Sequence, residues 1–234
     1  MLFTQSALEY AAQRRPGEAL VVLQAGCATA GGDLDLDALR ASGYGVTLTM
    51  LDDDNEVTRA AVAGRPDLRP AVLGELRAVP LVPRSADIVH CCLLLDRISH
   101  AELVLGRLVD ALRPGGLLLL RTADRETAAG FLDRVLPRWL RGLAWHSLRP
   151  GEPGPYPAVY EQLTSARGIQ LFAARHGLVI SRREVCSRLD SRRRPVIRAA
   201  RKLVAGATRG RLTAAHDELR YVVRKPEDRF ARVL

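Results

Sequence analysis

Residues 108–120 read LVDALRPGGLLLL. Apolar residues at helical spacing fill positions 101–112, then Pro114, Gly115 and Gly116 interrupt them, and a continuous apolar run follows at 117–120. Proline and paired glycines end a helix, and a short unbroken apolar run has the length of a buried strand. The stretch therefore predicts a helix, a tight turn and a strand, which is the unit from which parallel sheets are built.

The same alternation of strand-like and helical runs extends outward from this stretch. Toward the N-terminus, strands are expected at 19–23, 46–51, 70–73 and 88–94, and helices at 2–14, 34–40 and 56–63. Toward the C-terminus, helices are expected at 127–140, 165–176 and 195–204, and strands at 178–185 and 218–224. Strands and helices joined in alternation by short turns predict an α/β fold with a doubly wound, mostly parallel sheet of seven strands.

The chain of 234 residues is expected to form a single domain. The alternation is interrupted after the fifth expected strand, where a helical stretch leads into the Pro/Gly-rich run LRPGEPGPYPAVY at 148–160. We therefore expect a core of residues 18–121 and 165–225, a lid-like insertion at 122–164, and a basic segment at 181–211.

The net charge of +9 is unevenly distributed along the chain. Residues 1–180 hold 19 basic and 20 acidic side chains, whereas residues 181–234 hold 16 basic and 6 acidic ones. Almost all the basic residues are arginines, and aromatic side chains do not interleave with them as in proteins that stack on nucleic-acid bases. The pattern argues against a nucleic-acid partner and leaves a peripheral contact with an anionic surface through 192–211 open.

The spacing of the cysteines and the hydropathy of the chain indicate where in the cell the protein is expected. The four cysteines show no CxxC spacing and no histidine pairs of the kind that bind zinc, so we expect reduced thiols and no metal site. No apolar run is long enough to span a bilayer, and no signal peptide is evident. These features predict a cytoplasmic protein.

Four segments carry a resemblance to a known family. LVDALRPGG matches a helix–turn–strand signature, TMLDDD at 49–54 ends a strand in acids, and VPLVPRSADIVHCCLLLDRI at 79–98 runs into the fourth strand with Asp87 at a family position. LQAGCATAG at 23–31 lies where a glycine loop follows the first strand. The chain thus resembles the class I methyltransferases that use S-adenosylmethionine (SAM), in particular small-molecule enzymes of actinobacteria. The resemblance implies a Rossmann-like sheet and SAM as the cofactor.

The resemblance also implies the cofactor-binding residues. The acid that ends the second strand binds both ribose hydroxyls, which places Asp52 there with Asp53 beside it, and Glu75 follows the third strand on the adenine side. Gln24 stands where the family has an acid near the amino group of SAM. The full implied set is Gln24, Gly26, Cys27, Ala28, Asp52, Asp53, Glu75 and Cys91.

The loop departs from the family pattern. Ala28 and Ala30 replace two glycines, which adds methyl groups where the cofactor would lie against the backbone. Gln24 removes a negative charge but keeps hydrogen-bond acceptors. We therefore interpret 23–31 as a slightly degraded cofactor loop.

The expected activity is SAM-dependent methyl transfer to a small-molecule acceptor of secondary metabolism. Methyl transfer depends on positioning, and a general base is needed only where the acceptor must lose a proton; His146 in the insertion is the candidate. One alternative is a methyltransferase-fold protein without methyl transfer, as a partner subunit or a repurposed biosynthetic enzyme. Another is an RNA or DNA methyltransferase that uses the basic segment. The oligomeric state is not predicted.

Overall fold

A computed structural model describes residues 2–15, 17–29, 33–68, 70–148, 152–187 and 195–227. Its centre is one seven-stranded sheet in the order β3-β2-β1-β4-β5-β7-β6. The strands are β1 (Leu20–Ala25), β2 (Val46–Asp53), β3 (Ala71–Gly74), β4 (Ala86–Cys92), β5 (Leu112–Ala123), β6 (Val179–Cys186) and β7 (Glu218–Arg224). The α-helices are α1 (Leu2–Ala11), α2 (Leu36–Ala41), α3 (Glu56–Ala63), α4 (Ala101–Ala111), α5 (Ala128–Val135), α6 (Arg138–Leu148), α7 (Ala166–Arg175) and α8 (Pro195–Ala207).

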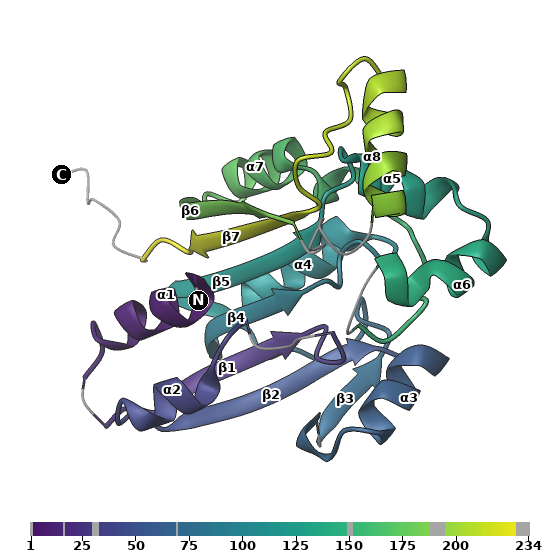
Figure 1. The fold of residues 1–234 in the computed structure, drawn as a ribbon. Coiled ribbons are helices and arrows are strands. Elements are labelled where there is room, and N and C mark those ends of the chain that lie inside the picture. The colour runs from purple at the N-terminus through teal and green to yellow at the C-terminus, as the bar shows by residue number, and fades with distance from the viewer. Residues whose placement is uncertain are drawn as a thin grey trace.

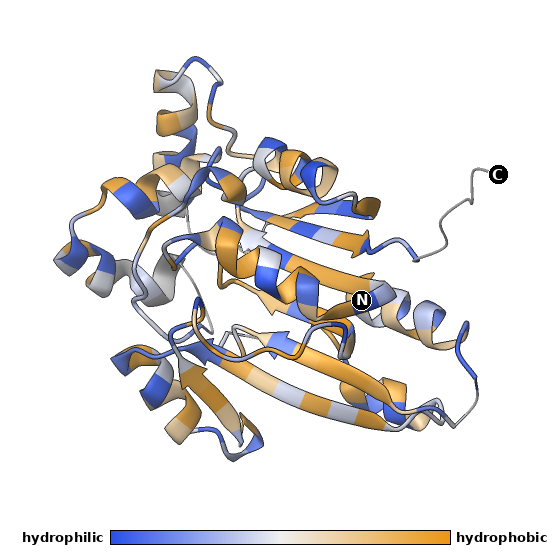
Figure 2. Cartoon of the chain, turned by 180° about the vertical axis from the view of Figure 1, so that it is seen from behind, coloured by the Kyte–Doolittle hydropathy of each residue, from blue (hydrophilic) through white to orange (hydrophobic). Residues whose placement is uncertain are grey.

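The sheet is parallel from β3 to β5, and β7 is antiparallel to both of its neighbours, β5 and β6. Helices lie on both faces, so the central strands are mostly apolar, and Figure 2 shows them as mostly orange bands. Every residue of β4 is buried. The prediction of a doubly wound, mostly parallel seven-stranded sheet is confirmed.

The core has one layer on each face of the sheet. On one side, α1 and α2 pack against Leu20, Val22 and Ile88. On the other side, α4 and α7 pack against Leu23, Val89 and their neighbours. Figure 1 places α3, α5, α6 and α8 near the end of the sheet toward which the arrowheads of the parallel strands point. The carboxyl ends of the strands, where ligands of such sheets bind, therefore face these helices.

Two expected elements differ from the structure. The single helix expected at 127–140 is two helices, α5 and α6, because Leu136 takes an extended conformation before Pro137, as residues before proline do. Residues 113–116, which were expected to form a turn, belong to β5, and this strand begins directly after α4. Lys225 donates hydrogen bonds from Nζ to the backbone oxygens of Val109 and Leu112 at 2.8 and 2.9 Å. The end of α4 is thus capped by a lysine that follows β7 rather than by glycine.

Candidate functional site

The loop after β1 is held tightly against the end of β4. Gly26 has a φ of +77°, and a Cβ on it would overlap the backbone oxygen of Cys92. Its amide donates to Leu51 O at 3.0 Å. Thr29 Oγ1 donates to Cys92 O at 2.8 Å. Gly26 is therefore required by the close approach of two backbones, whether or not a ligand binds.

The residues that follow Gly26 are buried rather than open to a cleft. Cys27 and Ala28 are 0 and 3% exposed. Burial raises the pKa of the Cys27 thiol to about 12, so it stays protonated and unreactive at neutral pH. Ala30 lies outside the described residues, so its predicted role has no structural counterpart here.

Asp52 at the end of β2 is completely enclosed. Its Oδ2 accepts a hydrogen bond from the Ala28 amide at 2.9 Å, and its Oδ1 accepts one from the Asp53 amide at 2.8 Å. The same Oδ1 forms an ion pair with Nη2 of Arg97. The carboxylate expected to bind the ribose hydroxyls therefore already has protein partners on both oxygens.

Arg97 is the residue that closes this position. It follows β4, its side chain is 1% exposed, and its Nη2 also lies 3.0 Å from Asp53 Oδ1. Its guanidinium carbon lies 3.9 Å from the ring centroid of Tyr156, which belongs to the segment 122–164. Nε and Nη1 of Arg97 are buried without a hydrogen-bond acceptor. A guanidinium sandwiched between two carboxylates and an aromatic ring thus fills the edge of the sheet.

The buried Asp52 and the partly exposed Asp53 share the one guanidinium of Arg97, which therefore compensates their negative charge only in part. Burial raises the pKa of Asp53 to about 6, although Arg97 acts in the opposite direction. The neighbouring Asp52 adds to the rise through its hydrogen bond and its charge. The Asp53 carboxyl therefore takes up a proton closer to neutral pH than an ordinary aspartate does, and its ionised form offers acceptors to any hydroxyl group that enters.

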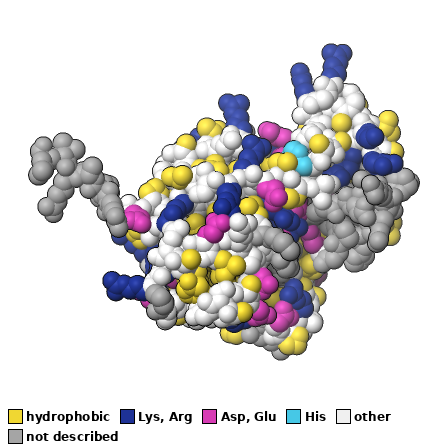
Figure 3. Space-filling view, turned by 60° about the vertical axis from the view of Figure 1, so that its left-hand side comes forward, with side chains coloured by type: hydrophobic (Ala, Val, Ile, Leu, Met, Phe, Trp, Pro, Cys, Tyr) yellow, Lys and Arg dark blue, Asp and Glu magenta, His cyan; other side chains and the backbone are white. Residues whose placement is uncertain are grey.

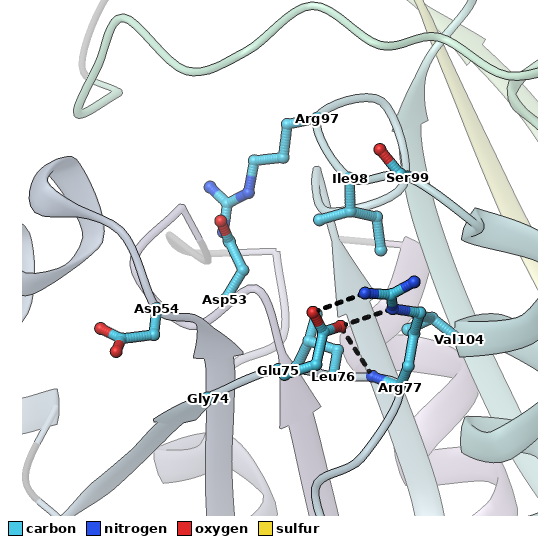
Figure 4. A pocket seen from close by; sticks show the side chains of 10 residues that line it. All are labelled: Asp53, Asp54, Gly74, Glu75, Leu76, Arg77, Arg97, Ile98, Ser99 and Val104. Carbon is cyan, nitrogen blue, oxygen red and sulfur yellow. Dashed lines mark hydrogen bonds and ion pairs between the residues drawn. The ribbon is translucent and has the colours of Figure 1, made fainter.

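A cavity of about 440 Å³ opens beside this cluster, between the ends of β2 and β3 and the start of α4. Asp53, Glu75, Arg97 and Ser99 supply polar groups to its wall, and Gly74, Leu76, Ile98 and Val104 supply apolar ones. Figure 4 shows Asp53 and Arg97 turned toward each other above the cavity, while Glu75 is paired with Arg77 at 2.9 Å. That ion pair lowers the pKa of Glu75 to about 2.

The structure brings some of the predicted site residues together and separates others. Ala28, Asp52 and Asp53 are linked by hydrogen bonds, and Asp53 and Glu75 share the cavity. Gln24 is the register neighbour of His90 and lies on the face covered by α1 and α2. Cys91 packs in the core on the opposite face, where burial raises its pKa.

Two further expectations concern His146 and Asp87. His146 belongs to α6, but its side chain lies outside the described residues. Asp87 is fully buried far from the loop; it accepts a hydrogen bond from the Val21 amide at 2.9 Å and pairs with Arg14 and Arg113. Asp87 therefore organises the fold, with two arginines holding its charge.

Sequence reasoning missed Arg97. A signal was present, since a charged pair, Asp96 and Arg97, follows the apolar run of β4 at the same sheet edge as Asp52. Only the fold shows that the guanidinium turns back under Tyr156 onto Asp52.

Comparison with known proteins supports the fold. No family model matches the sequence, and no curated protein matches it significantly. Among solved structures, the SAM-dependent methyltransferase from Mesorhizobium loti is similar over 93% of this chain and 96% of its own, with a TM-score of 0.51 and 18% identity. The chain has the Rossmann-like fold of the class I methyltransferases. The [4+2]-cyclase SpnF is also similar, over 96% of this chain and 81% of its own, with a TM-score of 0.51 and 16% identity.

Proposed function

We propose that the chain is a SAM-dependent methyltransferase that acts on a small-molecule acceptor. The observation that carries the proposal is the cavity at the ends of β2 and β3, where Asp53 and Glu75 line one wall directly beside Asp52. In class I folds this edge takes the nucleoside of the cofactor. The residue types suit a nucleoside, because carboxylates accept hydrogen bonds from ribose hydroxyls and Leu76, Ile98 and Val104 offer an apolar wall.

The cofactor would supply a methyl group on a sulfonium, and the residues of the chain would bind and orient it. Asp52 and Asp53 would hold the ribose, and the loop at Gly26 would approach its remaining part. Because both oxygens of Asp52 have protein partners, binding requires Arg97 to release that carboxylate. The unpaired Nε and Nη1 of Arg97 make this release less costly than breaking a fully satisfied network.

The test is calorimetric titration with S-adenosylhomocysteine, which has the nucleoside but cannot transfer methyl. We expect the wild type to bind. Asp52→Ala should weaken binding by about tenfold or more, because a charged hydrogen-bond acceptor contributes about 1.5–3 kcal/mol. Asp67→Ala is the control, since Asp67 lies outside the cavity wall and pairs with Arg65 at the surface at 2.7 Å. Equal losses in both variants, or no binding to the wild type, would contradict the proposal.

A methyltransferase-fold protein without methyl transfer is the second candidate. The enclosure of Asp52 by Arg97 favours it, and the cyclase among the similar structures is named for a different reaction. The two candidates separate on Arg97→Ala. If Arg97 only gates the site, this variant should bind S-adenosylhomocysteine more tightly than the wild type. If the edge no longer forms a cofactor site even without Arg97, wild type and variant should both fail to bind S-adenosylhomocysteine.

A further inference from the structure

Three side chains of types that can ligate a metal lie together on the sheet face that is covered by α1 and α2. They are Asp33, His90 and Cys92, and their ligand atoms all lie within 4.8 Å of one another. His90 and Cys92 alternate along β4 and therefore point to the same face. Asp33 comes from the segment before α2, and its Oδ2 lies 3.9 Å from Cys92 Sγ.

His90 is the unusual member of this group. It is 1% exposed, and neither Nδ1 nor Nε2 has a hydrogen-bond partner. The rings of Phe3 and His90 meet in a T-shaped arrangement, with their centroids 5.5 Å apart. A neutral imidazole has a free lone pair on one ring nitrogen, which is the atom that binds a metal. A buried imidazole with two orphaned nitrogens is costly unless a further partner binds it.

The charges around Asp33 would support a bound cation. Arg121 forms an ion pair with Asp33 Oδ2, and Arg220 Nη2 lies 3.3 Å from Asp33 Oδ1. Arg121 is held in turn by Glu218 at 2.8 Å, and Arg220 faces Glu184 at 3.9 Å. Two arginines and three carboxylates leave this network with one net negative charge. It would orient Asp33 as outer-shell partners orient a metal-bound carboxylate.

We propose that Asp33, His90 and Cys92 bind a zinc ion. One nitrogen, one sulfur and one carboxylate oxygen form a ligand set that zinc prefers over magnesium or calcium, which take oxygen ligands. Binding converts the Cys92 thiol to a thiolate, and one proton leaves to solvent. Zinc with the Cys92 thiolate then adds one net positive charge to the network and offsets its negative charge.

This site is distinct from the nucleoside edge but is connected to it through the backbone. Cys92 O accepts the hydrogen bond from Thr29 that holds the loop after β1. A metal on Cys92 would therefore fix the end of β4 to which this loop is tied. The sequence prediction of no metal site rested on local spacing, and it could not show that Asp33 approaches a His-x-Cys pair almost sixty residues away.

The experiment uses the full chain, stripped of metal by a chelator under reducing conditions and titrated with Co²⁺. We expect one Co²⁺ per chain, a thiolate-to-cobalt charge-transfer band in the near ultraviolet, and loss of that band when Zn²⁺ is added. Cys92→Ser should abolish the band. Cys91→Ser is the matched control, because Cys91 is its equally buried neighbour on the other face of the sheet.

Both the wild type and the variants can give a result that overturns the zinc assignment. Less than stoichiometric Co²⁺ in the wild type would refute it without any variant. A band that survives Cys92→Ser, or disappears equally in Cys91→Ser, would place the metal elsewhere. Asp33→Ala, at a less buried position, should weaken Co²⁺ binding at least tenfold while circular dichroism shows an unchanged fold. Unchanged affinity in Asp33→Ala would also reject the assignment.

Discussion

At the scale of single residues, Gly26 is the position where the loop allows the least change. Gly26→Ala should destabilise the fold in two ways, through strain at a φ of +77° and through overlap of the new methyl with Cys92 O. Gly43 is the matched control, because its φ is +88° but nothing lies within 4 Å of a Cβ there. We expect about 1–2 kcal/mol for Gly43→Ala from strain alone, and about 1–3 kcal/mol more for Gly26→Ala. Urea unfolding of both variants measures the difference, and equal losses would contradict the close approach.

At the same scale, the raised pKa of Asp53 predicts how the stability of the fold depends on pH. Its pKa is raised by burial to about 6 in the folded state, above the unfolded value near 3.9. The folded state therefore holds the proton more tightly, and this contribution to stability is fully present below pH 4 and is lost as the pH rises through 6. Asp53→Asn should remove that loss. The stability of the variant relative to wild type should therefore increase as the pH rises from 4 to 7. Urea unfolding across this range checks it; a constant difference between the two proteins would be inconsistent with a raised pKa.

At the scale of elements, the segment between β5 and α7 contributes an aromatic side chain next to the candidate site. Tyr156 lies over Arg97, and Trp145 of α6 meets Tyr156 edge to face with ring centroids 6.2 Å apart. Tyr156→Ala should free Arg97 to leave Asp52 and so increase the association rate of S-adenosylhomocysteine, measured by stopped-flow fluorescence. Tyr160→Ala is the control from the same segment, because its hydroxyl donates to Asp133 at 2.8 Å and its ring faces Arg134. A similar rate change in both variants would show a general loosening instead of a gate.

The strands and helices also show how much of the fold could be predicted from the sequence. Apolar runs and turn residues located all seven strands, because burial on two faces leaves a strong pattern. They failed at Leu136, where the effect of Pro137 on its predecessor divides one helix into two. They also failed at 113–116, where Lys225, which follows β7 far along the chain, caps α4. The acids at 52–54 were visible in the sequence, but the partner that encloses Asp52 was not. Contacts such as Arg97 to Asp52 depend on side-chain direction after the strand ends, which periodicity does not encode.

At the scale of the whole molecule, α5, α6 and α8 form a basic lobe with exposed apolar side chains. Residues 125–148 and 195–211 together hold nine basic and two acidic side chains. Trp139 and Leu143, four residues apart on α6, are 70 and 77% exposed, and Leu203 of α8 is 73% exposed. α8 packs against α5, and in Figure 3 basic side chains project from the top of the molecule, where Figure 1 places α8. Arg192 to Arg194 lie outside the described residues. No helix in the described part of the chain is both long and apolar enough to span a membrane.

The expected contact of 192–211 with an anionic surface stays a prediction. The exposed apolar side chains of α6 favour a lipid bilayer as that surface. Arginines attract an anionic bilayer, and a tryptophan and a leucine beside them can bury apolar surface at about 25 cal/mol per Å². The chain should co-sediment with vesicles that contain anionic lipid, and added salt should weaken binding by screening. The double variant Trp139→Ala and Leu143→Ala should bind at least tenfold more weakly, whereas the exposed residues Leu103 of α4 and Leu171 of α7 can be replaced by alanine as a control without loss. Equal loss in both double variants, or retention on heparin without vesicle binding, would instead assign the charge to another polyanion.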